Sequence, residues 1–169
     1  GSMTQSTTIW VASDHAGFEL KERVLSTLRD EEYATRLLAQ DQMSYIVRDG
    51  GPSDDQRVDY PQFAWPLTER VAEGLAAGQV TRGILICGTG IGVSLVANRH
   101  PEIRAALAHN LFTAEMARRH NDAQILCLGA RVIGRDLALA MVDTFLKTPF
   151  DGGRHADRVN SLQSLDVST

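Results

Sequence analysis

The sequence is poor in cysteine, in long apolar runs and in excess charge of either sign. Its two cysteines, Cys87 and Cys127, lack the close spacing of metal-binding pairs, and a reducing compartment disfavours a disulfide, so both are expected to be free thiols. No apolar run is long enough to span a bilayer, and the N-terminus has no signal-peptide pattern. The net charge of −4 provides no general surface for nucleic acid. We therefore expect a cytoplasmic protein that binds neither membranes nor nucleic acid.

What the chain does contain is an ordinary globular composition over 169 residues, with 43% hydrophobic and 22% charged residues. This length suits one domain with a sizeable core. Gly1 and Ser2, which precede Met3, resemble the remnant of a purification tag. We expect residues 1–7 to be this remnant and a disordered N-terminus, residues 8–160 to form one domain, and residues 161–169 to be a C-terminal tail.

The stretch from residue 83 to residue 99 carries the strongest signal for a ligand site. An apolar run typical of a strand buried on both faces leads into Cys87 and then into a loop, after which a helical pattern resumes. Three glycines alternate in this loop: Gly88, Gly90 and Gly92. They permit a sharp turn and close approach to a ligand, and the N–H groups at the start of the next helix favour negative charge. The Cys87 thiol and the Thr89 hydroxyl are the side chains of this loop that can do chemistry.

The glycine loop does not match the common nucleotide-binding motifs. A dinucleotide-binding fingerprint needs a third glycine three residues after the second, where this chain has Val93, and the Gly-Lys-Ser or Gly-Lys-Thr of a P-loop is absent. The structural alternative is a tight connection that binds nothing. The loop itself predicts a cradle for an anion.

Other polar side chains lie close to predicted strands. Asp14 and His15 separate a β-rich run over residues 8–12 from a helical pattern. Tyr60 begins a helix predicted to run to about residue 77, and its hydroxyl can be presented to a site. The structural alternatives are that Asp14 caps the helix, that His15 is exposed and that Tyr60 packs against its neighbours.

More donors and acceptors occur in the C-terminal half. A helix predicted over residues 113–119 ends in a polar run that contains His120 and Asn121, which is either part of a site or a solvated helix end. Arg131 follows the last predicted strand, over residues 124–128.

Two further arginines lie near the C-terminus. Arg154 and Arg158 are four residues apart, so on a helix both guanidinium groups project from one face and can hold a dianion such as a phosphate. The alternative is that they form salt bridges with Asp151 and Asp157.

Repeated strand–helix units predict an α/β fold. Further strands are expected over residues 44–48 and 104–108, which gives a Rossmann-like three-layer αβα sandwich with a five-stranded parallel sheet. Ligands of such sheets bind at the carboxyl ends of the strands. We expect all candidate groups except the two C-terminal arginines to converge there.

Six motifs occur in this order: Asp14-His15-Ala16-Gly17, Asp59-Tyr60-Pro61, Ile86-Cys87-Gly88-Thr89-Gly90-Ile91-Gly92, Arg119-His120-Asn121-Asp122, Gly129-Ala130-Arg131-Val132-Ile133-Gly134 and Gly153-Arg154-His155-Ala156-Asp157-Arg158-Val159. The combination resembles the ribose/galactose phosphate isomerase family, which includes ribose-5-phosphate isomerase B and the galactose-6-phosphate isomerase subunits. It extends from Ile9 to Val159. Each motif alone is weak, and their consistent order makes the resemblance specific.

The resemblance implies an enzyme that interconverts ribose 5-phosphate and ribulose 5-phosphate, a step of the pentose phosphate pathway, through a cis-enediolate and without metal or organic cofactor. It also implies a homodimer or tetramer whose sites are completed by groups from two subunits. The implied catalytic residues are Cys87 as base, Thr89 as an enediolate contact and His120 as the acid that opens the furanose ring. The implied substrate contacts are Asp14, His15, Tyr60, Asn121 and the loop residues Gly88, Gly90, Ile91 and Gly92, and the implied phosphate contacts are Arg131, Arg154 and Arg158.

The chain departs from the family pattern in three places. Some relatives carry a glutamate base just after the glycine loop, where this chain has Val93, so the thiol is expected to serve as base here. Asn110 stands where many relatives have aspartate, and the segment over residues 31–55 is longer than in compact members. Cys127 lies inside a predicted apolar strand and is expected only to pack.

Two other functions stay open. The same mechanism could act on galactose 6-phosphate, allose 6-phosphate or a tetrose phosphate, or the chain could be a non-catalytic module that binds a sugar phosphate. The intact pairs Asp14-His15 and His120-Asn121 favour a pentose, because a tetrose phosphate that cannot close a furanose needs no ring-opening acid. Cys87 beside Thr89 favours an enzyme, since a binding module has no use for a base.

Overall fold

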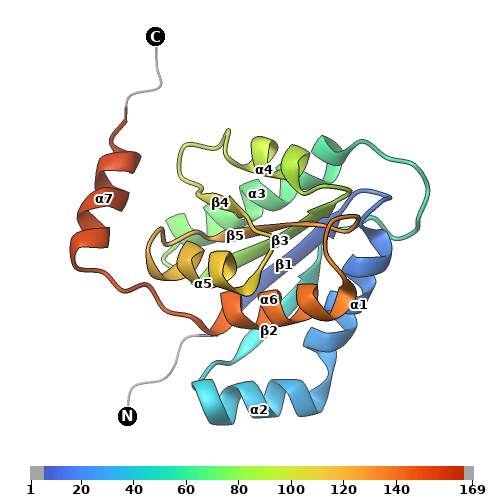
Figure 1. The fold of residues 1–169 in the computed structure, drawn as a ribbon, viewed down its shortest axis with the longest axis horizontal. Helices are drawn as coiled ribbons and strands as arrows, with labels where there is room; N and C mark the ends of the chain where they lie inside the picture. Colours follow the sequence, from blue (N-terminus) through green and yellow to red (C-terminus); the bar gives the residue numbers. More distant parts are fainter. Residues whose placement is uncertain (1–5, 166–169) are drawn as a thin grey trace.

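The computed structural model describes residues 6–165, and its centre is one five-stranded parallel sheet with the order β2-β1-β3-β5-β4 (Figure 1). The strands are β1 (Thr7–Ser13), β2 (Tyr45–Asp49), β3 (Thr81–Cys87), β4 (Ala105–Leu107) and β5 (Ile125–Gly129). The helices are α1 (Phe18–Arg29), α2 (Glu31–Asp41), α3 (Tyr60–Ala76), α4 (Ile91–Ala97), α5 (Leu111–Arg119), α6 (Arg135–Lys147) and α7 (Arg154–Gln163). This arrangement confirms the predicted Rossmann-like α/β sandwich.

Helices cover both faces of the sheet. In Figure 1, α3 and α4 lie on one face, and α1, α5 and α6 lie on the other. The central strand β3 shows why the sequence needs two layers, because Ile84 and Ile86 join the core under α1 and α6 whereas Leu85 joins the core under α3. A strand whose successive side chains are buried on opposite faces reads as a continuous apolar run.

The segment over residues 31–55, which the resemblance predicts to be longer than in compact relatives, contains a helix and an edge strand. Asp30 ends α1 and caps α2, since its side chain accepts a hydrogen bond from the Tyr33 backbone N–H at 3.0 Å. The Tyr33 hydroxyl donates to Asp143 of α6 at 2.7 Å, and burial together with this carboxylate raises the pKa of Tyr33. Helix α2 is therefore a separate helix anchored to α6, and does not continue α1.

The borders of regular structure differ slightly from the expected domain limits. Strand β1 begins at Thr7, one residue before the expected start, and α7 extends to Gln163, into the expected tail. The rest of the expected tag remnant and tail, residues 1–5 and 166–169, lies outside the described residues. None of the helices between residues 6 and 165 is both long and apolar enough to cross a membrane.

Helix α7 stands away from the sandwich (Figure 1). It follows α6 after an extended segment and lies beyond the end of the sheet at which the strands begin. We call this end the amino end of the sheet, and the opposite end, where the strands finish, the carboxyl end. The two ends hold different parts of the candidate site.

Candidate functional site at two ends of the sheet

Cys87 ends β3 at the carboxyl end of the sheet. Its side chain is buried, and the Gly90 backbone N–H donates a hydrogen bond to Sγ at 3.1 Å. The Thr89 hydroxyl oxygen accepts from the Ile91 N–H at 3.2 Å. A backbone donor aimed at sulfur stabilises negative charge there, so this arrangement suits a thiolate.

Glycine is required at position 90 by both conformation and space. Its φ of +80° lies in the left-handed region. A Cβ at this position would lie 2.5 Å from Leu107 Cδ1 and 2.9 Å from the carbonyl carbon of Leu128. The loop therefore folds tightly over the ends of β4 and β5, which is what brings the Gly90 N–H to the sulfur.

Two of the predicted contacts flank the same loop. A Cβ on Gly88 would lie 3.2 Å from Arg131 Nη1, and a Cβ on Gly92 would lie 2.7 Å from Tyr60 Cζ. The Arg131 backbone N–H also donates to the Gly88 carbonyl at 2.9 Å. Arg131 thus lies against Gly88 and Tyr60 against Gly92, where the absence of a Cβ leaves room for each side chain.

Asp14 and His15 reach the same end through β1. The Asp14 N–H donates to the Ile86 carbonyl at 3.1 Å, which places the two residues beside the end of β3. Asp14 is buried and its Oδ1 accepts from the Gly17 N–H at 3.0 Å, so it orders the turn before α1. His15 is half-buried, and its Nδ1 lies 3.1 Å from the Val58 carbonyl oxygen and 3.2 Å from the Val58 nitrogen. Its Nε2 has no hydrogen-bond partner among residues 6–165 and can face a ligand.

His120 and Asn121 lie at the opposite end of the sheet within one chain. They follow α5 and precede β5, whereas Gly129, which pairs with Cys87, ends β5. The intervening strand spans about 13 Å. The expectation that these two residues converge with Cys87 is therefore wrong for a single chain, because they follow a helix that returns to the start of the sheet.

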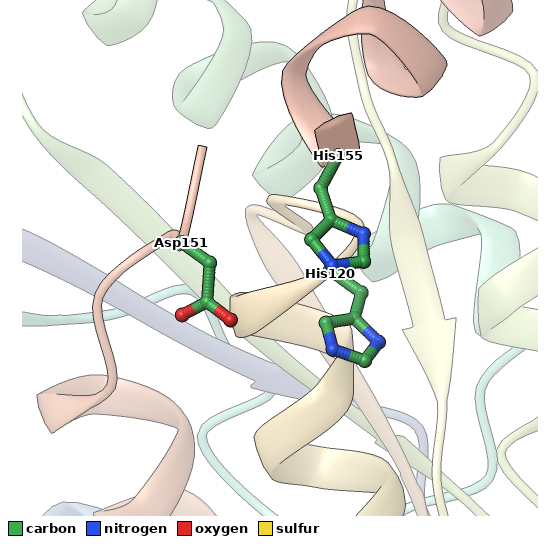
Figure 2. A group of neighbouring side chains, drawn as sticks. All are labelled: His120, Asp151 and His155. Atoms are coloured by element: carbon green, nitrogen blue, oxygen red, sulfur yellow. The ribbon is translucent and has the colours of Figure 1, made fainter. Parts of the chain in front are cut away.

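The amino end holds a second cluster, in which His120 stacks on His155 of α7 with ring centroids 4.0 Å apart and planes at 10° (Figure 2). Arg154 and Arg158 are exposed beside it. Burial, and then the neighbouring His120 and the two arginines, lower the pKa of His155. His155 belongs to the motif over residues 153–159, but the sequence predicts no role for it, because only the fold stacks it on His120.

The salt bridges expected as the alternative role of Arg154 and Arg158 do not form within residues 6–165. Asp151 pairs instead with Arg119, whose Nη2 lies 3.2 Å from Oδ2. The two arginines are left facing solvent on the first turns of α7. They are therefore available to bind an anion.

His120, Asp151 and His155 have ligand atoms within 4.8 Å of one another, which is the spacing that a metal ion requires (Figure 2). Their arrangement does not favour one. Parallel rings direct their nitrogen lone pairs alongside each other rather than toward a common point. Asp151 is already bound by Arg119, and Arg154 and Arg158 add positive charge, so the cluster suits an anion better than a cation.

Three other positions that the sequence singled out have structural roles. Cys127 is fully buried in β5, and burial raises the pKa of its thiol, so it packs and stays protonated. Val93, just after the glycine loop, is a residue of α4 and is buried in the core under α3. Asn110 caps α5, because its Oδ1 accepts from the Thr113 N–H at 2.8 Å. Cys87 is thus distinguished by its position rather than by its residue type.

The chain matches the family model described as ribose/galactose isomerase over residues 9–162. It is 37% identical over 153 residues to ribose-5-phosphate isomerase B of Escherichia coli. This match covers 90% of this chain and 92% of the relative. Ribose-5-phosphate isomerase B of Clostridium thermocellum superposes with a TM-score of 0.75 at 44% identity, covering 92% of this chain and 95% of that one. The Mycoplasma genitalium enzyme with bound ribulose-5-phosphate gives a TM-score of 0.77 at 36% identity, over 95% and 96% of the two chains.

Proposed function

Because this chain belongs to the ribose/galactose isomerase family and is an aldose–ketose isomerase, we propose that it interconverts ribose 5-phosphate and ribulose 5-phosphate through a cis-enediolate. The observation that carries the proposal is the Gly90 N–H on the sulfur of Cys87, in a chain similar to an enzyme that binds ribulose-5-phosphate. The Cys87 thiolate removes the proton from carbon 2 of the open aldose and returns it to carbon 1. The hydroxyl proton moves from the oxygen on carbon 2 to the oxygen on carbon 1, so the carbonyl moves from carbon 1 to carbon 2.

The glycine loop supplies the electrophile for this step. Negative charge develops on the two substrate oxygens as the proton leaves, and the loop N–H groups together with the Thr89 hydroxyl can hydrogen-bond to it. Asp14, His15 and Tyr60 lie around the loop and are proposed to hold the sugar hydroxyls. Arg131, over Gly88, is proposed to contact the phosphate.

We propose that each site is completed by a second copy of the chain. His120 as the ring-opening acid, Asn121 as a hydroxyl contact and the arginines of α7 are at the amino end, so they can reach a substrate at a Cys87 loop only across an interface. Exposed apolar side chains next to the loop support such an interface. They are Ile91, Leu95, Leu111 and Phe112, which are 44–67% exposed.

A second candidate substrate class is another sugar phosphate. A few side chains that line the pocket decide sugar length, so the mechanism alone does not select a pentose. The stacked His120 supports the pentose, because it provides the acid that a furanose needs and an acyclic tetrose phosphate does not.

The test is a panel of phosphorylated aldoses and ketoses incubated with the protein in deuterium oxide. We expect deuterium at the exchanging carbon of ribose 5-phosphate and ribulose 5-phosphate, with turnover of these two fastest. A faster hexose or tetrose phosphate would replace the pentose as substrate. Binding of sugar phosphates without exchange would identify a binding module.

A further inference from the structure

Arg104 joins the two parts of the cluster at the amino end. It immediately precedes β4, and its Nε donates to the carbonyl oxygens of Asn121 at 3.0 Å and Asp122 at 3.2 Å. Nη2 donates to the same Asp122 carbonyl at 2.9 Å, and Nη1 donates to Gln163 Oε1 of α7 at 2.7 Å. One guanidinium group thus holds both the turn after His120 and the end of the helix that carries His155.

The turn that Arg104 holds has an unusual backbone. Asp122 has a φ of +49°, in the left-handed region that most side chains avoid. Its carboxylate accepts from Arg118 Nη1 at 2.9 Å, and Arg118 also donates to the Ala123 carbonyl at 2.7 Å. Both arginine side chains are almost enclosed, with exposed fractions of 14% and 4%. Hydrogen bonds from these enclosed guanidinium groups hold the backbone of residues 121–123 in one conformation.

We propose that Arg104 is a positioning residue for ring opening, which fixes the turn behind His120 and so aims the imidazole at a substrate held by the second copy. This inference rests on the proposed function and adds a residue to it. A proton transfer needs heavy atoms about 2.6–3.2 Å apart, so it tolerates little displacement of the turn. A misplacement of about 1 Å can cost up to about a hundredfold in rate.

Ring opening can be separated from proton abstraction by the choice of substrate. Ribose 5-phosphate exists mainly as a furanose, which opens when the bond from carbon 1 to the ring oxygen breaks. The ring oxygen then takes a proton, and the carbon 1 hydroxyl gives up its proton to become the aldehyde. Ribulose 5-phosphate is acyclic, because its carbon 5 oxygen carries the phosphate and cannot attack carbon 2. Exchange of the carbon 1 proton of ribulose 5-phosphate therefore needs the base and the loop but no ring-opening acid.

The test compares Arg104→Met with the matched control Arg82→Met. Arg82 lines the same cavity of about 530 Å³ as Arg104, but its Nη1 donates to the carbonyl of its neighbour Thr81 at 2.9 Å and not to the turn after His120. For Arg104→Met we expect kcat on ribose 5-phosphate to fall about tenfold, while deuterium exchange into saturating ribulose 5-phosphate stays within about twofold of wild type. Arg82→Met should leave both rates within about twofold.

An equal loss of both rates in Arg104→Met, or no loss in either, would overturn the proposal. If Arg104→Met does not fold, as judged by circular dichroism, Arg104→Lys is measured and the same ratio of rates decides. Absence of exchange into ribulose 5-phosphate in the wild-type protein would instead refute the proposed function. The two failures are therefore distinguishable.

Discussion

The two ends of the sheet are built from different chemistry. At the carboxyl end, the Gly90 backbone N–H of the glycine loop donates to Cys87 Sγ, and the Arg131 guanidinium group lies against Gly88 of the same loop. At the amino end, His120 and His155 are surrounded by arginine side chains. Neutral dipoles can stabilise a charge that develops during a reaction, whereas guanidinium groups suit a charge that is always present, such as a phosphate. We therefore propose that the carboxyl end holds the reacting carbons, with Arg131 as a phosphate contact, and that the amino end of a second copy supplies the ring-opening acid and further phosphate contacts.

The largest expected effect comes from removing the sulfur at the carboxyl end. Cys87→Ala should lower turnover of ribose 5-phosphate by about 10³-fold, because no other base lies on the loop. The measurement is deuterium incorporation together with isomerisation rate. The control is Cys127→Ala, which should keep its activity and lose about 1 kcal/mol of stability through a small cavity. Retained turnover in Cys87→Ala would mean that the base has been assigned wrongly.

Mixing two inactive variants asks whether the two ends belong to one site. Cys87→Ala and His120→Ala should each be nearly inactive. When equal amounts exchange subunits, half of the dimers contain one chain of each variant, and one of the two sites in such a dimer combines an intact Cys87 with an intact His120. The mixture should therefore recover about a quarter of wild-type activity. The activity of the mixture is measured after mild denaturation and refolding of the two chains together. No recovery, despite heterodimers detected by native mass spectrometry, would show that sites do not combine groups from two copies.

The smallest expected effect is on stability at the amino end. The pKa of His155 is lowered in the folded chain, whereas an unfolded histidine has a pKa of about 6.5. The contribution of His155 to the free energy of unfolding is therefore fully present above about pH 6.5, and it is lost as the pH falls through the folded pKa. His155→Phe keeps an aromatic ring against His120 but cannot take up a proton. The temperature of thermal unfolding should therefore fall less steeply between about pH 7.5 and about pH 5 in the variant than in the wild type. Parallel declines would show that protonation of His155 does not matter to folding.

Much of the fold and half of the candidate site follow from local patterns. The apolar run before Cys87 and the glycines after it indicate a buried strand and a tight loop, and the structure has both. Asp14 follows β1 just as Cys87 ends β3, so parallel pairing alone brings them together. The sequence does not distinguish a first helix that continues past Asp30 from a separate α2, because both would use the same helix-forming residues.

The other half depends on contacts between residues distant in the sequence. The stack of His120 on His155 joins α5 to α7, and the bond of Arg104 to Gln163 joins β4 to the same helix. Neither contact has a signature in residue spacing, because a periodic pattern reports only which face of an element is buried.

The amino-acid sequence by itself determined the order of strands and helices, the glycine loop under Cys87 and the family to which the chain is similar, since each depends on neighbouring residues. Only the tertiary structure decided that His120 and the arginines of α7 lie at the end of the sheet opposite to Cys87. The physical reason is that a helix after a parallel strand must return the chain to the start of the sheet, so a residue that ends such a helix is separated by a whole strand length from a residue that ends a strand.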